Sequence, residues 1–295
     1  MYKIVLVLSQ LKCDRMSEAF VNMNIGIIGQ GFVGNAVYQK FKSFFTVYTF
    51  DIINKKSNSS FDDLVKNCSV IFTCVPTPMN NDGSCNTKIL EDLLSKLNER
   101  TKSIIVNKST IPPGTTDNFN LKFNNIQIIF NPEFLTERNS IEDFDKQERI
   151  ILGGPRPATT LVKQIYSKVF PNSYVVKTGS KHAEMVKYFT NCFLANKVSF
   201  SNEMYDLCRV LELDYDKVVE YAILDKRLGN SHWSVPGPDG DLGFGGHCFP
   251  KDLSAIINLS DELGTTNNVL KSIKKTNDKL RKNRDWEKMK GRAVN

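Results

Sequence analysis

Three glycines between a short apolar run and a helical pattern constrain this chain more than any other feature of its sequence. The apolar run Asn24–Ile28 leads into the glycine motif, Gly29, Gly31 and Gly34, and apolar side chains at helical spacing follow it. A second apolar run, Thr46–Asp51, comes next. The order strand, glycine turn, helix and strand is the opening of a doubly wound α/β sheet.

Further strands are predicted in the first half of the chain, each after a helical or polar stretch, as crossovers between parallel strands require. They are Val70–Val75, Ser103–Asn107, Gln127–Phe130, Ile150–Leu152 and Ser173–Val176. We therefore expect an α/β fold, with a Rossmann-type doubly wound parallel sheet over residues 23–178.

The second half of the chain is predicted to be almost entirely helical. Lys181–Leu211 has a helical period and contains neither Gly nor Pro, and the Gly- and Pro-rich stretch Gly229–Gly246 precedes two more predicted helices. We expect an all-α central domain over residues 179–295. Residues 1–22 precede the first core strand and are predicted to be an N-terminal extension.

The composition excludes several classes of protein. Of the 295 residues, 41% are hydrophobic and 24% are charged, which is the balance of a globular protein and not of a disordered or fibrous one. No apolar run approaches the roughly 20 residues of a membrane helix, and we predict neither a signal peptide nor a membrane partner. The seven cysteines form no CxxC pair and lie at no ligand spacing from the three histidines, so we expect free thiols in a reducing cytoplasm and no metal site.

The net charge of +7 is confined to one end of the chain. Residues 271–295 contain ten Lys and Arg residues against three acids, whereas bases and acids balance over the rest of the sequence. No motif that reads nucleic acid accompanies this charge, so we predict no nucleic-acid partner.

The glycine motif, followed by Asp51 at the end of the next strand, is the fingerprint of a dinucleotide-binding loop. Gly29 allows the tight turn, Gly31 lets the backbone approach a pyrophosphate, and Gly34 lets helix and strand pack. Asp51 would bond the ribose hydroxyls and repel a 2′-phosphate, which predicts NAD rather than NADP. A glycine turn in an unrelated α/β protein is the alternative. The predicted cofactor-binding residues are Gly29, Gly31, Phe32, Val33, Gly34, Asp51, Thr77 and Thr110.

Other loops follow predicted strands, where an open α/β sheet binds its ligands. Val75–Pro78 and Ser109–Thr116 combine prolines with hydroxyls that bond a cofactor or a water, or they are plain turns. Asn131–Glu137 places Glu133 and Glu137 four residues apart, on one face if the segment is helical. The alternative is that these acids favour the dipole at a helix N-terminus.

The long predicted helix carries a polar pair at helical spacing. Lys187 and Asn191 stand four residues apart, with Glu184 and Ala195 on the same face. A lysine and an amide on a helix ordinarily form a solvated face, and the spacing alone leaves that interpretation open.

The segment Gly243–Asp252 is the most specific string in the sequence. Its glycines let backbone N–H groups approach a ligand, and Pro250 suits the first turn of a helix. This leaves Cys248 at the helix N-terminus, where the pKa of a thiol falls, with Asp252 near enough to bond a water or the thiol. A buried, inert cysteine is the alternative.

These motifs, in this order, make the chain resemble the nucleotide-sugar dehydrogenases, the UDP-glucose and GDP-mannose dehydrogenase family, and above all its UDP-glucose branch. The resemblance runs from Met23 to about Val294. It is carried by GIIGQGFVG, VPTP, STIPPGTT, NPEFLTE, AEMVKYFTNCFLANKVSFSNE and GFGGHCFPKD. Members of this family oxidise the C6 alcohol of a nucleotide sugar to a carboxylate in two hydride transfers, with two NAD per turnover.

The resemblance implies roles for individual residues. Cys248 matches the nucleophile that forms a thiohemiacetal and then a thioester. Lys187 and Asn191 match the groups that stabilise the developing oxyanion. The remaining predicted catalytic residues are Asp252 and Thr110, which hold and activate a water, and Glu133, which serves proton transfer or thioester hydrolysis.

The resemblance also implies how the substrate is bound, with UDP-glucose as the predicted substrate. Lys251 and Arg149 favour UDP-glucose, whereas His247 also occurs in relatives that act on N-acetylated hexosamines. Arg227 matches an arginine that reaches the sugar in the neighbouring subunit's site, and the helix from Lys181 matches the family's dimer core, which predicts a homodimer. The predicted substrate-binding residues are Phe134, Leu135, Glu137, Lys187, Asn191, Arg227, Gly243, Phe244 and Gly245.

The chain departs from the family pattern at residues 290–295. They look like the entry to a third domain, which in the family grips the uridine diphosphate. The catalytic set is complete without that domain, and we expect an active dehydrogenase. The alternative is a truncated, weakly active or inactive NAD-binding dimer that needs a partner chain for UDP binding.

Overall fold

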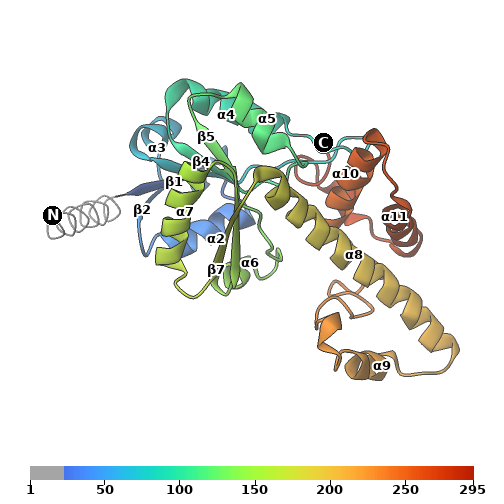
Figure 1. The fold of residues 1–295 in the computed structure, drawn as a ribbon. Coiled ribbons are helices and arrows are strands. Elements are labelled where there is room, and N and C mark those ends of the chain that lie inside the picture. Colours follow the sequence, from blue (N-terminus) through green and yellow to red (C-terminus); the bar gives the residue numbers. More distant parts are fainter. Residues whose placement is uncertain (1–22) are drawn as a thin grey trace, which may run out of the picture. The chain divides into compact units, whose positions relative to one another are not determined.

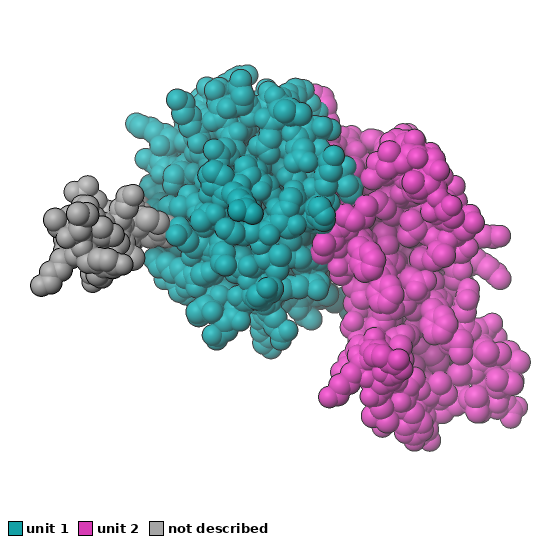
Figure 2. All heavy atoms as spheres, viewed as in Figure 1, with its two compact units in different colours: residues 1–75, 89–109, 113–184 teal, residues 76–88, 110–112, 185–295 magenta. Residues whose placement is uncertain are grey.

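The computed structural model describes residues 23–295, and the predicted extension over residues 1–22 lies outside the described residues. The described chain divides into two compact units (Figure 2). Unit 1 comprises residues 23–75, 89–109 and 113–184, and unit 2 comprises residues 76–88, 110–112 and 185–295. Two short segments from the first half of the chain, each beyond the end of a strand, therefore belong to the second unit.

Unit 1 is built around a seven-stranded sheet with helices on both sides (Figure 1). Its strands run in the order β2-β1-β3-β4-β5-β6-β7, and the direction of the connections reverses between β1 and β3. Open α/β sheets bind their ligands at such a switch point. The strands are β1 (Asn24–Ile28), β2 (Thr46–Phe50), β3 (Val70–Thr73), β4 (Ile104–Asn107), β5 (Gln127–Phe130), β6 (Arg149–Gly153) and β7 (Tyr174–Thr178).

The Rossmann-type sheet is confirmed, but the expectation that all its strands are parallel is wrong at one pair. Strand β6 runs antiparallel to β5, and the two meet at a single register position, Phe130 opposite Gly153. The connection between them contains one short helix, α6 (Ser140–Asp145), which packs against α2 (Phe32–Phe41). A parallel pair needs a crossover that carries the chain back across the sheet, and this connection does not provide one.

The core of unit 1 is aromatic. The buried ring of Phe41 lies edge-on to Phe72, 5.3 Å away between ring centroids, and to Tyr166, 5.6 Å away. Burying an apolar side chain of this size contributes about 1.5–3 kcal/mol. The other helices of this unit are α3 (Phe61–Asn67), α4 (Lys88–Arg100), α5 (Thr115–Lys122) and α7 (Arg156–Val169), with a 3₁₀ turn, η1 (Asn54–Lys56).

Unit 2 is helical, as expected. The 31-residue helix α8 begins in unit 1 and continues through unit 2. Its buried residues Cys192 and Ala195 pack with Phe244, Leu253 and Ile273 in the main core cluster of this unit. The elements are α8 (Ser180–Val210), α9 (Tyr215–Ala222), η2 (Lys226–Leu228), α10 (Phe249–Glu262), α11 (Asn268–Leu280) and η3 (Asp285–Lys288).

The last residues of the chain pair with the segment that follows β3. Val294 forms a parallel bridge with Met79, whose N–H donates to the carbonyl oxygen of Ala293 at 2.8 Å. Met79 also forms an antiparallel bridge with Cys85. Among residues 23–295, no helix is both long enough and apolar enough to cross a membrane.

Candidate active site

The glycine motif of unit 1 forms a tight turn between β1 and α2. Gly29 has a φ of 91°, and a Cβ on it would lie 2.5 Å from the carbonyl oxygen of Cys74. A Cβ on Gly34 would lie 1.8 Å from the carbonyl oxygen of Gly29. Both positions therefore require glycine because the protein's own backbone occupies the space, as the tight turn and the close helix packing predict.

Gly31 is different, because nothing in the described chain fills the space beside it. A Cβ there would meet no atom within 4 Å, and Gly31 is the N-cap of α2. The cap provides no side-chain hydrogen bond, and the first turn of α2 contains no acid. Gly31 thus leaves open space beside the N-terminus of α2, which suits a phosphate group at the switch point of the sheet.

The Asp51 carboxylate faces the glycine loop from the end of β2. It accepts hydrogen bonds from the backbone N–H of Gln30 at 2.6 Å and of Ile53 at 2.8 Å. These bonds hold the carboxylate beside the loop, where a dinucleotide places its ribose hydroxyls. The residues of unit 1 fit the NAD that the sequence predicts.

Hydrogen bonds from hydroxyl groups connect the two proline-containing loops, Val75–Pro78 and Ser109–Thr116. The Thr77 hydroxyl donates to the carbonyl oxygen of Thr110 at 2.7 Å within unit 2, and the Ser109 hydroxyl donates to Val75 within unit 1. Thr77 and Thr110 are both buried. The hydroxyl proton of Thr77, predicted to reach a cofactor or a water, therefore bonds the backbone instead.

The segment Asn131–Glu137 is an irregular loop, so neither helical interpretation of its two acids holds. The reason is local, because the buried Glu133 carboxylate accepts the N–H of Leu135 at 2.8 Å and folds the chain back on itself. Glu137 is exposed, whereas the ring of Phe134 lies 4.6 Å from the guanidinium of Arg149. Glu133 and Glu137 share no helix face.

The polar face of α8 is buried, which overturns the solvated alternative. Lys187 is 2% exposed and Asn191 is 6% exposed. One turn earlier, the Glu184 carboxylate accepts the N–H groups of Gly114 at 2.6 Å and Thr116 at 2.8 Å. Glu184 thereby caps α5, and burial raises the pKa of its carboxyl group.

Cys248 is the N-cap of α10, with Pro250 in the first turn, as predicted. Four residues on, the buried Asp252 carboxylate accepts the side-chain amide of Asn191 at 2.6 Å and the ammonium of Lys251 at 2.6 Å. Cys248 itself is only half-buried, so its thiol is not an inert core group. Unit 2 therefore brings a cysteine, an amide, a carboxylate and a cation to one helix end.

The charges at this helix end interact. Burial alone would lower the pKa of the Lys251 ammonium, but the Asp252 carboxylate, together with Cys85 and Cys248, raises that pKa above its ordinary value. Lys251 is thus a buried cation that faces two cysteines and one carboxylate.

Sequence reasoning missed Cys85 and Tyr188 at this cluster. The Cys85 thiol donates to the carbonyl oxygen of Thr110 at 3.6 Å, and burial raises its pKa although Lys251 opposes the shift. Burial, reinforced by the charges of Cys85 and Asp252, raises the pKa of Tyr188 well above its ordinary value. No spacing signal marked either residue, because Cys85 arrives from a separate loop.

The second glycine loop does not offer its backbone freely, contrary to expectation. The N–H groups of Gly243, Phe244 and Gly246 donate to side chains of Asn202, Asn277 and Asp285, respectively. Arg227, predicted to reach a neighbouring subunit, is exposed and ion-paired with Asp225.

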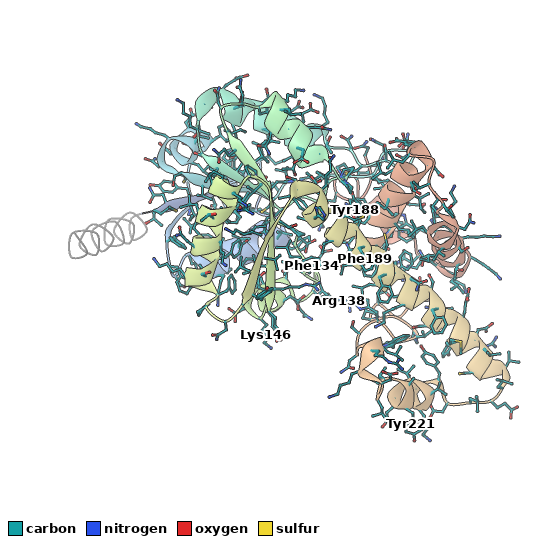
Figure 3. The ribbon with its side chains drawn as sticks, in the orientation of Figure 1. Phe134, Arg138, Lys146, Tyr188, Phe189 and Tyr221 are labelled. Carbon is teal, nitrogen blue, oxygen red and sulfur yellow. The ribbon has the colours of Figure 1, made fainter. Side chains whose placement is uncertain are left out.

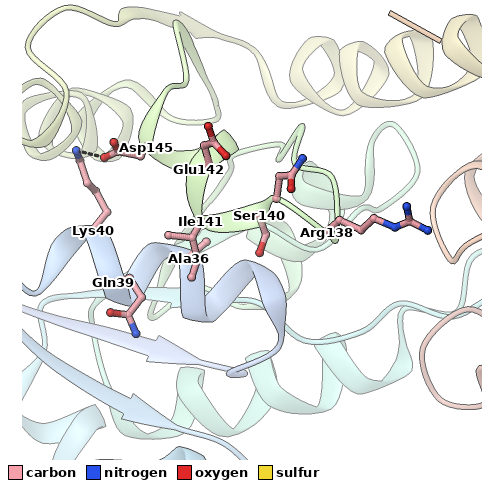
Figure 4. Close-up of a pocket in the computed structure, with 9 residues that line it drawn as sticks. Ala36, Gln39, Lys40, Arg138, Ser140, Ile141, Glu142 and Asp145 are labelled. Atoms are coloured by element: carbon pink, nitrogen blue, oxygen red, sulfur yellow. Dashed lines mark hydrogen bonds and ion pairs between the residues drawn. The ribbon is translucent and has the colours of Figure 1, made fainter. Parts of the chain in front are cut away.

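A separate pocket of about 440 Å³ lies in unit 1 between α2 and the segment that ends in α6 (Figure 4). An ion pair between Lys40 and Asp145 closes one side of it. None of the predicted site residues lines this pocket. Its lining residues are Ala36, Gln39, Lys40, Arg138, Asn139, Ser140, Ile141, Glu142 and Asp145.

Two family models match the chain. The UDP-glucose/GDP-mannose dehydrogenase family, NAD binding domain, matches residues 50–170, and the central domain of the same family matches residues 181–279.

Several curated proteins are similar over most of this chain. YtcA of Bacillus subtilis is 35% identical over 77% of this chain and 55% of its own length. The UDP-glucose 6-dehydrogenase of Pseudomonas aeruginosa is 33% identical over 74% of this chain and 50% of its own length. The chain thus spans about half the length of the curated relatives it matches.

Solved structures show the same fold. A UDP-glucose dehydrogenase from Pyrobaculum islandicum superposes with a TM-score of 0.78 at 27% identity, covering 88% of this chain and 68% of that one. A UDP-D-ManNAc dehydrogenase from Pyrococcus horikoshii superposes with a TM-score of 0.72 at 21% identity, covering 87% and 68%. Because the two models of one family together match residues 50–170 and 181–279, the chain belongs to the UDP-glucose/GDP-mannose dehydrogenase family and carries its NAD-binding and central domains.

Proposed function

We propose that this chain oxidises the C6 alcohol of a nucleotide sugar to the uronic acid, with NAD as oxidant and UDP-glucose as the substrate. The observation that carries the proposal is the helix end in unit 2, where the half-buried Cys248 lies beside the buried Lys251–Asp252–Asn191 group. The NAD-binding domain in unit 1 supplies the second requirement of the reaction.

Covalent catalysis by Cys248 explains why a thiol stands at this position. NAD, when bound, accepts a hydride in each of the two oxidations. In the first, the alcohol becomes an aldehyde, and the Cys248 thiolate then adds to the aldehyde carbon to form a thiohemiacetal. Loss of the second hydride gives a thioester, whose C–S bond is cleaved by water to release the acid and regenerate the thiol.

The buried polar groups act on charge and protons. Lys187 and Asn191 stabilise the oxyanion of the thiohemiacetal, and the bond from Asn191 to Asp252 fixes the orientation of the amide. Asp252 and Thr110 hold the water, and Glu133 moves its proton. Glu133 belongs to unit 1, and the other four residues belong to unit 2.

The substrate assignment rests on the similarity to enzymes named for UDP-glucose. In this proposal Phe134, Leu135, Glu137 and Arg227 contact the nucleotide sugar. The second candidate is a weakly active NAD-binding dimer, which the match to the NAD-binding domain of the family supports.

We also propose a homodimer, formed in the cytoplasm through α8 and α9. The two helices present large exposed apolar side chains, among them Phe189 on α8 and Tyr221 on α9 (Figure 3). Phe193 on α8 is also exposed. Phe189 and Phe193 stand one helical turn apart and are 71% and 55% exposed. An apolar stripe of this kind marks a protein–protein interface.

The test is NADH production, followed at 340 nm with UDP-glucose, GDP-mannose and UDP-N-acetylmannosamine in turn. We expect NADH and the uronic acid with UDP-glucose, and no net acid from Cys248→Ala, which retains its affinity for NAD. Cys208→Ala, which alters a buried cysteine packed on Tyr215, is the matched control and keeps its activity. A flat trace with all three sugars, in protein shown to bind NAD, refutes the proposal and leaves the second candidate.

A further inference from the structure

We propose that Asn277, Arg281 and Asp285 are positioning residues that hold the loop before Cys248 and thereby set the reactivity of its thiol. We call these three side chains the loop clamp. Asn277 belongs to α11, Arg281 follows it directly, and Asp285 begins η3. The importance of Cys248 rests on the proposed function, whereas the control of its thiol by the clamp does not.

Asn277 grips the loop at two atoms of one residue. Its side-chain oxygen accepts the N–H of Phe244 at 2.7 Å, and its side-chain amide donates to the carbonyl oxygen of Phe244 at 3.0 Å. Asn277 is 3% exposed, so water does not compete for these bonds. The two bonds fix the orientation of both peptide units around Phe244.

Arg281 ties the two ends of the loop to each other. Its side chain is 1% exposed and forms ion pairs with Asp239 at 2.5 Å and Asp241 at 3.6 Å, near the start of the loop. It also pairs with Asp285 at 3.4 Å, whose carboxylate accepts the N–H of Gly246 at 3.1 Å. The buried Arg281 cation holds the three carboxylates together, because removing it would leave these anions without their counter-charge.

The glycines of the loop fit this clamp rather than an open space. A Cβ on Gly243 would lie 2.3 Å from the side-chain oxygen of Asn277. A Cβ on Gly245 would lie 2.3 Å from the guanidinium of Arg281 and 2.4 Å from the Asp285 carboxylate. The two glycines therefore leave room for side chains of this protein that lie against the loop.

The clamp acts on Cys248 because the loop leads directly into α10. Gly246 is held by Asp285, and Cys248, two residues later, caps the helix. The ring of Phe249, next in the chain, packs on Phe244, 6.0 Å away between centroids. The clamp thus holds the backbone of residues 244 and 246. Because Cys248 comes two residues later, the clamp also sets the position of its thiol at the N-terminus of α10, near Lys251.

The experiment measures alkylation of Cys248 by iodoacetamide in the full-length protein, resolved from the other cysteines by peptide mass spectrometry. Arg281→Met and Asn277→Leu remove the clamp with similar side-chain volume. Arg281→Lys is the conservative variant. Lys274→Met removes a cation from the solvent side of α11, where Lys274 pairs with Asp278, and is the matched control.

We expect Arg281→Met and Asn277→Leu to slow alkylation of Cys248 at pH 7.5 by about threefold or more, and to move the midpoint of the pH–rate profile upward. Arg281→Lys recovers part of the rate, and Lys274→Met matches the wild type. A profile unchanged in both folded clamp variants would overturn the proposal, even if their melting temperatures fell, because the clamp would then be merely structural.

If Arg281→Met and Asn277→Leu fail to fold, the same alkylation measurement is made on Asp285→Asn. It keeps the size of the side chain but weakens the bonds to Gly246 and Arg281, and an unchanged profile in this variant contradicts the proposal. Alkylation needs neither NAD nor sugar. An inactive enzyme with clamp-dependent alkylation therefore refutes only the proposed function, and an active one without it refutes only the clamp.

Discussion

The two glycine loops of this protein look alike in sequence and differ in what surrounds them. In unit 1 the space beside Gly31 is open, and the loop precedes a helix N-terminus with no side-chain cap. In unit 2 the space beside Gly243 and Gly245 is filled by the side chains of Asn277, Arg281 and Asp285. The first loop leaves room for a ligand, whereas the second is shaped by contacts inside the protein.

This difference shows that a glycine-rich string has two separate physical causes. A glycine whose added Cβ would meet open space is explained by something outside the chain or by backbone conformation. A glycine whose added Cβ would meet a neighbouring atom within 3 Å is explained by packing. Both kinds occur within the first loop itself, since Gly34 packs on Gly29 while Gly31 faces open space.

The largest effect is expected at Gly34. Gly34→Ala would place a Cβ 1.8 Å from the carbonyl oxygen of Gly29, and the backbone cannot yield as a side chain can. We expect unit 1 to lose about 4 kcal/mol of unfolding free energy. Urea unfolding followed by circular dichroism measures this loss. Gly179→Ala is the control, because its Cβ would make an ordinary 3.4 Å contact, and equal losses in the two variants would contradict the packing role of Gly34.

A smaller loss is expected in the second loop. Gly245→Ala overpacks the clamp and should cost about 2 kcal/mol, because the side chains of Arg281 and Asp285 that its Cβ would meet have flexible ends. Tryptophan fluorescence in urea measures it, since Trp233 and Trp286 both lie in unit 2. The double variant Gly245→Ala/Arg281→Ala should lose less than the sum of the single variants, and strict additivity would show that the two residues do not meet.

The first half of the fold was predictable because local pattern and tertiary structure agree there. Strands β1 to β5 and the glycine turn are short apolar runs with punctuation at their ends, and buried parallel strands leave that signature. The direction of β6 was not predictable, because it depends on how α6 packs on α2. The irregular backbone of residues 131–137 depends on one hydrogen bond from Leu135 to Glu133, which no periodicity records.

The candidate site was predictable only where spacing on one element defines it. Lys187 and Asn191 share a helix face by their spacing, but whether that face is buried is a tertiary fact. In the sequence, Arg281 is one of ten Lys and Arg residues in the terminal segment, and nothing distinguishes it from the others. In the structure its side chain is 1% exposed and forms ion pairs with three carboxylates. Cys85 joins the helix end from a distant loop, and single-sequence patterns carry no information about such contacts.

At the first glycine loop, we expect a moderate effect on NAD affinity when Asp51 is changed. Asp51→Asn keeps the shape of the side chain but removes the charge that faces the ribose hydroxyls, so NAD affinity should fall about tenfold, or about 1.4 kcal/mol. Isothermal titration with NAD measures this change. Asp62→Asn, an exposed acid of the same unit, should bind NAD as the wild type does. An unchanged affinity in Asp51→Asn would remove Asp51 from the cofactor site.

The smallest effect is the pH dependence of stability that the second loop contributes. The hydrogen bond from Arg281 lowers the pKa of Asp239, and the backbone N–H of Asn283 lowers the pKa of Asp241. Because the folded pKa lies below the unfolded one, these carboxylates stabilise unit 2 at neutral pH, and this stabilisation is lost as the pH falls below about 4. Urea midpoints between pH 7 and pH 3 should therefore fall, and less steeply in Asp239→Asn. Equal slopes would contradict the role of this carboxylate.

The most direct test of the difference between the two loops is a paired NAD titration of Gly31→Ala and Gly245→Ala, with the melting temperature of each. We predict that Gly31→Ala melts as the wild type does but binds NAD about a hundredfold more weakly, because its Cβ enters the space left for the ligand. Gly245→Ala should melt at a lower temperature and bind NAD normally. Wild-type NAD affinity in Gly31→Ala would contradict the assignment of the open loop to the cofactor.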